Sequence, residues 1–165
     1  GPALAVPEII PIAYEPDYRT DTIGRFADGQ FLASITYAFP EGYRHGEGWE
    51  DAKRLYVVLH RFDVEGHHVD SDIRCAGTWR EQQRQHGDPD SVLARAEARM
   101  AELLDALPRR EFRSIGIRPF QLIVDDVLFG LVISQHGGHE DEDDWAELHP
   151  DGLGFCDPWN GEYST

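Results

Sequence analysis

Residues 55–62 read Leu-Tyr-Val-Val-Leu-His-Arg-Phe, an eight-residue run that is apolar on both faces of a strand. Strands of this kind are buried on both sides, so we expect this one at the centre of a sheet. The turn Asp-Val-Glu-Gly at 63–66 follows, and the chain returns with small or apolar residues at every second position from Val69 to Gly77. The sequence therefore predicts an antiparallel hairpin in the core of the fold.

The segments before this hairpin differ from each other in pattern. Residues 31–39 alternate strictly in side-chain character, which predicts a strand with one buried face. Residues 3–30 contain three prolines and a turn-forming Asp-Gly, which predicts an extended or irregular segment along the surface.

A single amphipathic helix is expected after the hairpin, over about 89–107. Asp88 is the expected N-cap, and Pro89 suits the first helical position. Pro108 ends the pattern. The apolar side chains at helical spacing are Leu93, Ala96, Met100, Leu103, Leu104 and Leu107. Arg95, Glu97, Arg99 and Glu102 are expected to point away from the core.

Further β-rich runs follow the helix. The sequence Asp125-Asp126 separates two of them and predicts a tight hairpin turn. The expected strands are 112–118, 120–124, 127–134 and 145–148. We therefore expect an α+β fold, with one antiparallel, strongly bent sheet of about six or seven strands and the helix packed on one face.

The 165 residues suit one domain spanning 1–165, with an acidic loop at 136–144. Gly1-Pro2 is typical of a tag remnant. No apolar run is long enough to span a membrane. Cys75 and Cys156 are too few for a disulfide framework, so they are expected to be small, buried or half-buried thiols in a cytoplasmic protein.

The charge is unevenly distributed along the chain. Residues 1–52 hold nine acids and three bases, residues 53–118 hold eleven acids and twelve bases, and residues 119–165 hold eleven acids and no base. The net charge of −16 therefore lies mostly in the last third. A field of this sign disfavours nucleic acid and favours basic proteins or metal cations, although it also confers solubility.

The last third offers acidic and aromatic groups that together suit a basic protein partner. Aromatic rings among carboxylates bind Lys and Arg through cation–π and ion-pair contacts. The candidate binding residues are the acidic Glu140, Asp141, Glu142, Asp143, Asp144, Asp151 and Asp157, and the aromatic Trp145, Trp159 and Tyr163. The alternative is that the C-terminal tail, Trp159 in particular, closes the edge of the core.

Two clusters of His and acidic residues, at 67–72 and 136–144, are weak candidates for a metal site. The candidate ligands are His68, Asp70, Asp72, His136 and His139. Strand alternation would put the first three on one face, at intervals of about 6.5 to 7 Å. Neither spacing matches a zinc motif or a calcium loop, so the sequence predicts no metal and no cofactor. The simpler interpretation of 67–72 is an exposed polar face whose other face, with Val69, Ser71 and Ile73, is buried.

Three stretches carry a family resemblance: Tyr-Arg-Thr-Asp-Thr-Ile-Gly-Arg-Phe at 18–26, Asp-Gly-Gln-Phe at 28–31 and Pro-Trp-Asn-Gly-Glu-Tyr-Ser-Thr at 158–165. They resemble a poorly characterised family of small bacterial proteins, some of which bear the name formate hydrogenlyase regulatory protein. The resemblance implies no catalytic residue. By composition the chain is also similar to immunity proteins, which neutralise toxins and are small and acidic.

No nucleophile elbow or glycine-rich phosphate loop occurs in the sequence. The sequence therefore predicts a non-enzymatic acidic protein that binds or inhibits a basic partner, as an immunity protein does. One alternative is a small enzyme or metal-dependent protein of a bacterial biosynthetic pathway that uses a His/Asp cluster. Another is a regulatory or scaffold module. The oligomeric state is not predicted.

Overall fold

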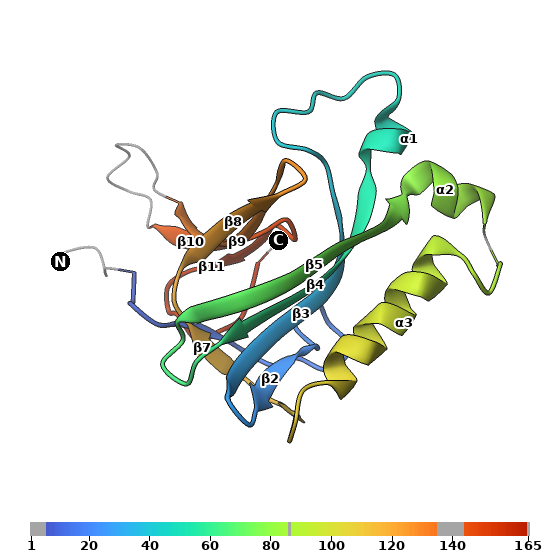
Figure 1. Cartoon of the computed structure of the whole chain (residues 1–165). Coiled ribbons are helices and arrows are strands. Elements are labelled where there is room, and N and C mark those ends of the chain that lie inside the picture. The colour runs from blue at the N-terminus through green and yellow to red at the C-terminus, as the bar shows by residue number, and fades with distance from the viewer. Residues whose placement is uncertain (1–5, 86, 135–143, 165) are drawn as a thin grey trace.

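A five-stranded antiparallel sheet forms the middle layer of the protein (Figure 1). The computed structural model describes residues 6–85, 87–134 and 144–164. The strand order is β5-β4-β3-β2-β6. The bounds are β2 Ile23–Phe26, β3 Gly29–Ala38, β4 Arg54–Phe62, β5 His68–Thr78 and β6 Glu111–Phe112. The predicted hairpin is confirmed, since β4 and β5 pair antiparallel.

Two further sheets pack with this layer. They are the four-stranded sheet β11-β10-β9-β8 and the two-stranded sheet β1-β7. The bounds are β1 Ile10–Ile12, β7 Ile115–Ile117, β8 Phe120–Val124, β9 Val127–Ser134, β10 Trp145–His149 and β11 Leu153–Phe155. The α+β class is confirmed, but the prediction of one strongly bent sheet is wrong, because the strands described form separate sheets.

The strands form separate sheets because β3 and β4 are buried on both faces. Phe31 packs against the helix layer, whereas Leu32 packs with the terminal strands on the other side. Leu32 and Ala33 are as buried as Phe31, so the predicted single buried face of 31–39 is also wrong. A strand with two buried faces needs a layer on each side, and these layers are α3 and the smaller sheets.

The hairpin turn at Asp125-Asp126 is confirmed. Val124 pairs with Val127, and both Asp residues have positive φ, of 53° and 63°. A two-residue turn of this geometry matches the right-handed twist of its strands, and Asp tolerates it better than most residues.

The amphipathic helix is confirmed as α3, Val92–Asp105, but it begins later than predicted. Ser91 is the N-cap, and its hydroxyl accepts a hydrogen bond from the N–H of Ala94 at 3.1 Å. Asp88 instead accepts from the N–H of Asp90 in the preceding turn. The buried face carries Val92, Ala96, Met100 and Leu103. Leu93 is 42% exposed and was wrongly assigned to this face.

Two short helices were not predicted: α1, Trp49–Ala52, and α2, Trp79–Arg84. The sequence does carry a signal for α2, because Thr78 and Glu81 form a capping box in which each side chain bonds the other residue's N–H. In the described part of the chain, no helix has the length and apolar character to cross a membrane.

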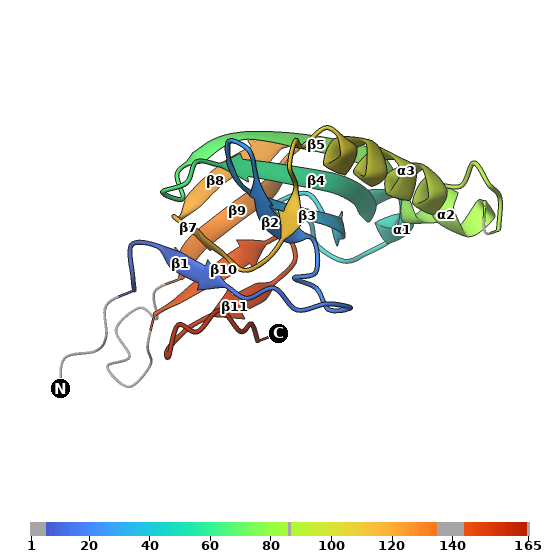
Figure 2. The ribbon, with the colours of Figure 1, turned by 90° about the horizontal axis from the view of Figure 1, so that it is seen from below.

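The N-terminal and C-terminal segments lie side by side, as Figure 2 shows. The N–H of Ala13 donates to the carbonyl of Gly161 at 2.9 Å, and β1 adds to β7. The N-terminal segment is therefore less irregular than predicted, because it supplies both β1 and β2.

Candidate functional site

The predicted acidic residues divide into three groups. Glu140, Asp141, Glu142 and Asp143, with His136 and His139, lie outside the described residues. Asp144 is half-buried and Asp157 is exposed. Asp151 is different, because its side chain is only 8% exposed and lies 3.7 Å from the guanidinium of Arg19. It is therefore a pocket residue and not part of an open acidic face.

The predicted aromatic residues serve mainly the core. Trp159 and Tyr163 are partly buried and pack against the apolar cluster around β1, β10 and β11. The hydroxyl of Tyr163 also accepts a hydrogen bond from the N–H of Arg19 at 3.2 Å. Trp145 is half-buried at the start of β10. Trp159 and Tyr163 of the C-terminal tail thus lie at the edge of the core, as the alternative interpretation of these residues expected.

The fold gathers two acidic segments that are far apart in sequence. Residues 13–22 and 144–164 together hold eight Asp and Glu and one Arg. They are joined by the Ala13–Gly161 bond and by Arg19, whose Nη2 donates to the carbonyl of Asp151 at 2.9 Å. We call these two segments the acidic terminal surface.

A hollow of about 270 Å³, the Asp151 pocket, lies where this surface meets β3. It is lined by Arg19, Asp21, Thr22, Ala33, Ser34, Ile35, Met100 and Asp151. Its walls therefore come from the N-terminal segment, β3, α3 and the turn after β10. Sequence reasoning missed Arg19, Asp21 and Ser34, because no local motif joins residues from such separate segments.

The ionised form of the Asp151 carboxyl is disfavoured by its burial. Burial raises its pKa above the ordinary value, although hydrogen bonds from the hydroxyls of Thr36 and Ser34 and the charge of Arg19 act in the opposite direction. Loss of hydration disfavours the ionised form. A second cation entering the pocket would stabilise this carboxylate, so the pocket favours a cationic group.

The edge of β3 beside this pocket is open. β2 pairs with β3 only from Gly29 to Leu32, and the N–H of Ala33 then donates to the carbonyl of Thr22 at 2.9 Å. Because backbone groups alternate in direction along a strand, the N–H and C=O groups of Ile35 and Tyr37 point to the same edge. Within the described chain, no neighbouring strand and no other acceptor bonds the N–H groups of these two residues.

The predicted grouping of His68, Asp70 and Asp72 on one face is wrong. Arg61 pairs with Asp70 and Phe62 with His68, so Val69 forms a β-bulge without a partner. A bulge reverses the alternation, which turns His68 to the opposite face from the two carboxylates. His68 stacks on Phe120 of β8. Asp72 bonds Arg99 of α3 at 2.9 Å, and Val69, expected to be buried, is 63% exposed.

His68 belongs instead to a cluster around the hydroxyl of Ser71. His60 Nδ1 lies 2.6 Å and His68 Nε2 lies 2.7 Å from Ser71 Oγ. The hydroxyl has one proton, so it donates to one imidazole and accepts from the other. Burial lowers the pKa of His60 to about 3, and that of His68 is also lowered. An imidazole this weakly basic is a poor general base at neutral pH.

No set of three His, Cys, Asp or Glu side chains converges as a metal site would require, among the residues that the structure describes. Both cysteines are free and exposed. The expectation that they are buried or half-buried is therefore wrong.

The chain was compared with known proteins at the level of families, curated sequences and solved structures. No family model, no curated protein and no solved structure matches it. The resemblance of residues 18–31 and 158–165 to a bacterial family therefore stays a prediction, and the evidence for a function comes from the chain's own geometry.

Proposed function

We propose that the protein is a non-enzymatic binding protein that takes a basic polypeptide segment along the open edge of β3. The observation that carries this proposal is the Asp151 carboxylate, buried in a pocket beside unpaired strand backbone. An extended segment added to an open edge gains backbone hydrogen bonds, and its alternate side chains enter neighbouring pockets. A Lys or Arg of that segment would approach Asp151 and Asp21.

The acidic terminal surface supports the basic character of the partner. Eight carboxylates against one arginine create a negative field around the pocket, and such fields attract cationic partners within about a Debye length. The acidic loop predicted at 136–144 lies outside the described residues, apart from Asp144. Masking a basic surface in this way is how an inhibitor or immunity protein would act.

The enzyme alternative has less support. Its predicted cluster is divided between two faces by the bulge at Val69, and in the Ser71 cluster that replaces it burial lowers the pKa of both imidazoles. A regulatory or scaffold module would use the same edge of β3, and the partner would distinguish it from an inhibitor.

The proposal predicts charge-dependent peptide binding. A labelled short peptide of alternating lysine and valine should bind, and the same peptide with acetylated lysines should bind at least about tenfold more weakly, because a charged hydrogen bond is lost. Fluorescence anisotropy over a salt series measures both affinities. Asp151→Asn should weaken the lysine peptide about tenfold, whereas Glu65→Gln, in the exposed turn after β4, should leave it unchanged.

Asp151→Asn should not unfold the protein. Asn can still accept from the hydroxyls of Ser34 and Thr36, and it removes a charge that burial disfavours. Affinity for the lysine peptide should also rise with pH as Asp151 ionises. Equal affinity for the two peptides, or an unchanged affinity in a folded Asp151→Asn variant, would remove the Asp151 pocket from recognition.

A further inference from the structure

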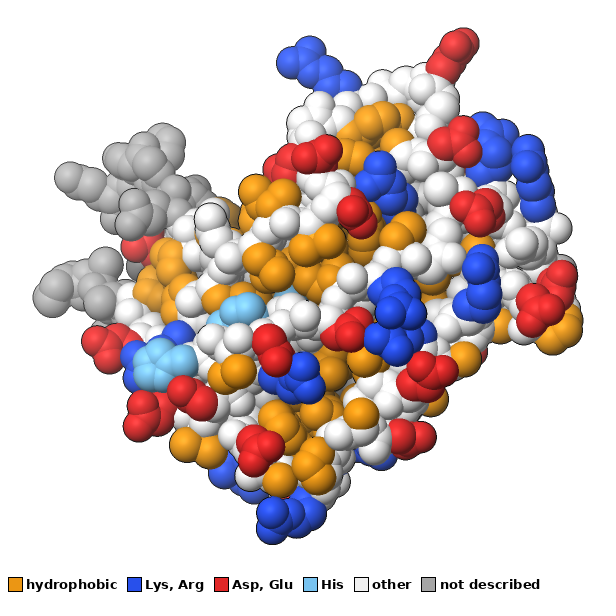
Figure 3. Space-filling view, in the orientation of Figure 1, with side chains coloured by type: hydrophobic (Ala, Val, Ile, Leu, Met, Phe, Trp, Pro, Cys, Tyr) orange, Lys and Arg blue, Asp and Glu red, His pale blue; other side chains and the backbone are white. Residues whose placement is uncertain are grey.

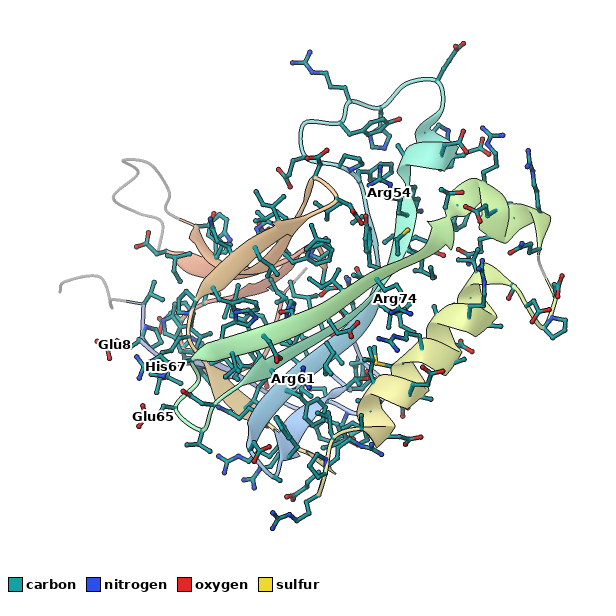
Figure 4. The ribbon with its side chains drawn as sticks, viewed as in Figure 1. Glu8, Arg54, Arg61, Glu65, His67 and Arg74 are labelled. Atoms are coloured by element: carbon teal, nitrogen blue, oxygen red, sulfur yellow. The ribbon has the colours of Figure 1, made fainter. Side chains whose placement is uncertain are left out.

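A second hollow, of about 370 Å³, has the opposite electrostatic character. It lies between β5 and α3 and is lined by Val57, Arg74, Cys75, Ala76, Arg95, Ala98, Arg99 and Glu102. Three guanidiniums thus converge on it, with Arg74 contributed by β5 and Arg95 and Arg99 by α3. Figure 4 shows Arg74 between the strand and the helix, and Figure 3 shows Lys and Arg side chains gathered over this face. We call it the arginine pocket.

Arg99 is fixed in place by its neighbours. Its Nη2 donates to Asp72 at 2.9 Å and its Nη1 to Glu102 at 3.3 Å. Its Nε is buried and has no hydrogen-bond partner among the described residues. This contradicts the prediction that Arg99 points away from the core. An unpartnered buried donor is uncommon in folded proteins and is readily satisfied by an acceptor that enters from outside.

Arg74 and Arg95 are unpaired. Within the described chain, neither guanidinium forms an ion pair or a hydrogen bond. The chain has 31 acids for 15 Lys and Arg, so an arginine without a carboxylate partner is unexpected. The three arginines at the hollow face two carboxylates, Asp72 and Glu102, both of which bond Arg99, so about one positive charge is in excess there and the guanidiniums of Arg74 and Arg95 are free to bind an anion.

The charge, size and apolar lining of the arginine pocket favour a small anion with an apolar group. A phosphate monoester carries about −1.5 to −2 charges near pH 7, which two guanidiniums balance, and their planar forks suit its oxygens. Val57, Ala76 and Ala98 supply apolar surface for the body of the ester. The volume falls at the lower end of the range for small-molecule sites. The net charge of −16 disfavours a large polyanion such as nucleic acid.

We propose that the arginine pocket binds a small phosphomonoester, with Arg74, Arg95 and Arg99 on the phosphate and the apolar floor under the ester group. The site is separate from the Asp151 pocket and does not depend on the peptide-binding proposal. It is a binding site, and no bond of the ligand is broken in it.

Calorimetric titration at physiological salt tests this site with three probes: phenyl phosphate, inorganic phosphate and phenol. Phenyl phosphate should bind with one-to-one stoichiometry, inorganic phosphate more weakly, and phenol not at all. Absence of saturable phenyl phosphate binding would overturn the site. Equal affinity for phenyl phosphate and inorganic phosphate would overturn the assignment to an ester.

Single variants then locate the binding. Arg74→Ala and Arg95→Ala should each weaken phenyl phosphate at least about tenfold, because each removes a charged donor. Both should keep the wild-type melting temperature, since neither side chain has a partner in the fold. Arg84→Ala, an exposed arginine of α2 outside the pocket, is the matched control and should bind as the wild type does. Equal affinities of the wild type and the three variants for phenyl phosphate would show that it binds outside the arginine pocket.

Discussion

The free energy of unfolding is expected to fall by about 4 kcal/mol as the pH is lowered from 6.5 to 3, through His60 alone. This imidazole is 1% exposed, and burial lowers its pKa from 6.5 to about 3 in the folded protein. Between pH 6.5 and 3, His60 therefore binds a proton in the unfolded chain but stays neutral in the folded protein. The two pKa values differ by about 3.5 units, and each unit is worth about 1.4 kcal/mol. A small part of this loss lies above pH 6.5 and below pH 3, which leaves about 4 kcal/mol within the range.

Urea unfolding at a series of pH values measures this loss. In His60→Phe the ring contacts with Phe62 and Phe120 are kept but the titrating group is gone, so the fall between pH 6.5 and 3 should be smaller by several kcal/mol. His45→Asn, at an exposed position, should behave as the wild type does. If wild type and His60→Phe lose the same stability over this range, His60 is protonated in the fold and our account of its burial is wrong.

Replacement of Leu103 by Ala is expected to cost about 2 to 5 kcal/mol. Leu103 is 9% exposed and packs in the cluster formed by α3 with β3 and β4. The truncation leaves a cavity where side-chain atoms made contact, and a packed interior relaxes only partly around it. Chemical denaturation of the two proteins under the same conditions gives the difference directly.

The same helix offers a matched control. Leu93 is 42% exposed, so Leu93→Ala should change the free energy of unfolding by less than about 0.5 kcal/mol. If both substitutions cost the same, α3 does not present its Leu103 face to the sheet. The comparison is informative because the sequence alone assigned both leucines to one apolar face.

Local patterns predicted the parts of the fold that local physics determines. The apolar run at 55–62 predicted an inner strand of the five-stranded sheet, although β3 and not β4 is its middle strand. Asp125-Asp126 predicted a turn whose two positive φ angles suit a hairpin. The start of α3 was misplaced because Asp88 and Ser91 both precede the helix, and both can cap. The bulge at Val69 has no signal of its own in the sequence, yet it decides which face His68 occupies.

The candidate site was only partly predictable for a related reason. Asp151 was selected for its charge, but its hydrogen-bond and charge partners Thr36, Ser34 and Arg19 are distant in sequence. The edge of β3 is open because β2 stops pairing with it at Leu32. The alternating pattern of residues 31–39 does not reveal where a neighbouring strand ends. Of the predicted acidic residues, Asp151 lines the pocket, together with Arg19, Asp21 and Thr22 of the N-terminal segment.

Amide hydrogen exchange at Ile35 and Tyr37 tests the central claim most directly. These N–H groups point to the open edge of β3 and have no partner in the described chain. Saturation with the lysine–valine peptide should slow their exchange strongly, because each would donate to the bound segment. The N–H groups of Ser34 and Thr36, which face β4, should change little. Peptide binding that leaves Ile35 and Tyr37 exchanging as fast as in the free protein would contradict recognition at this edge.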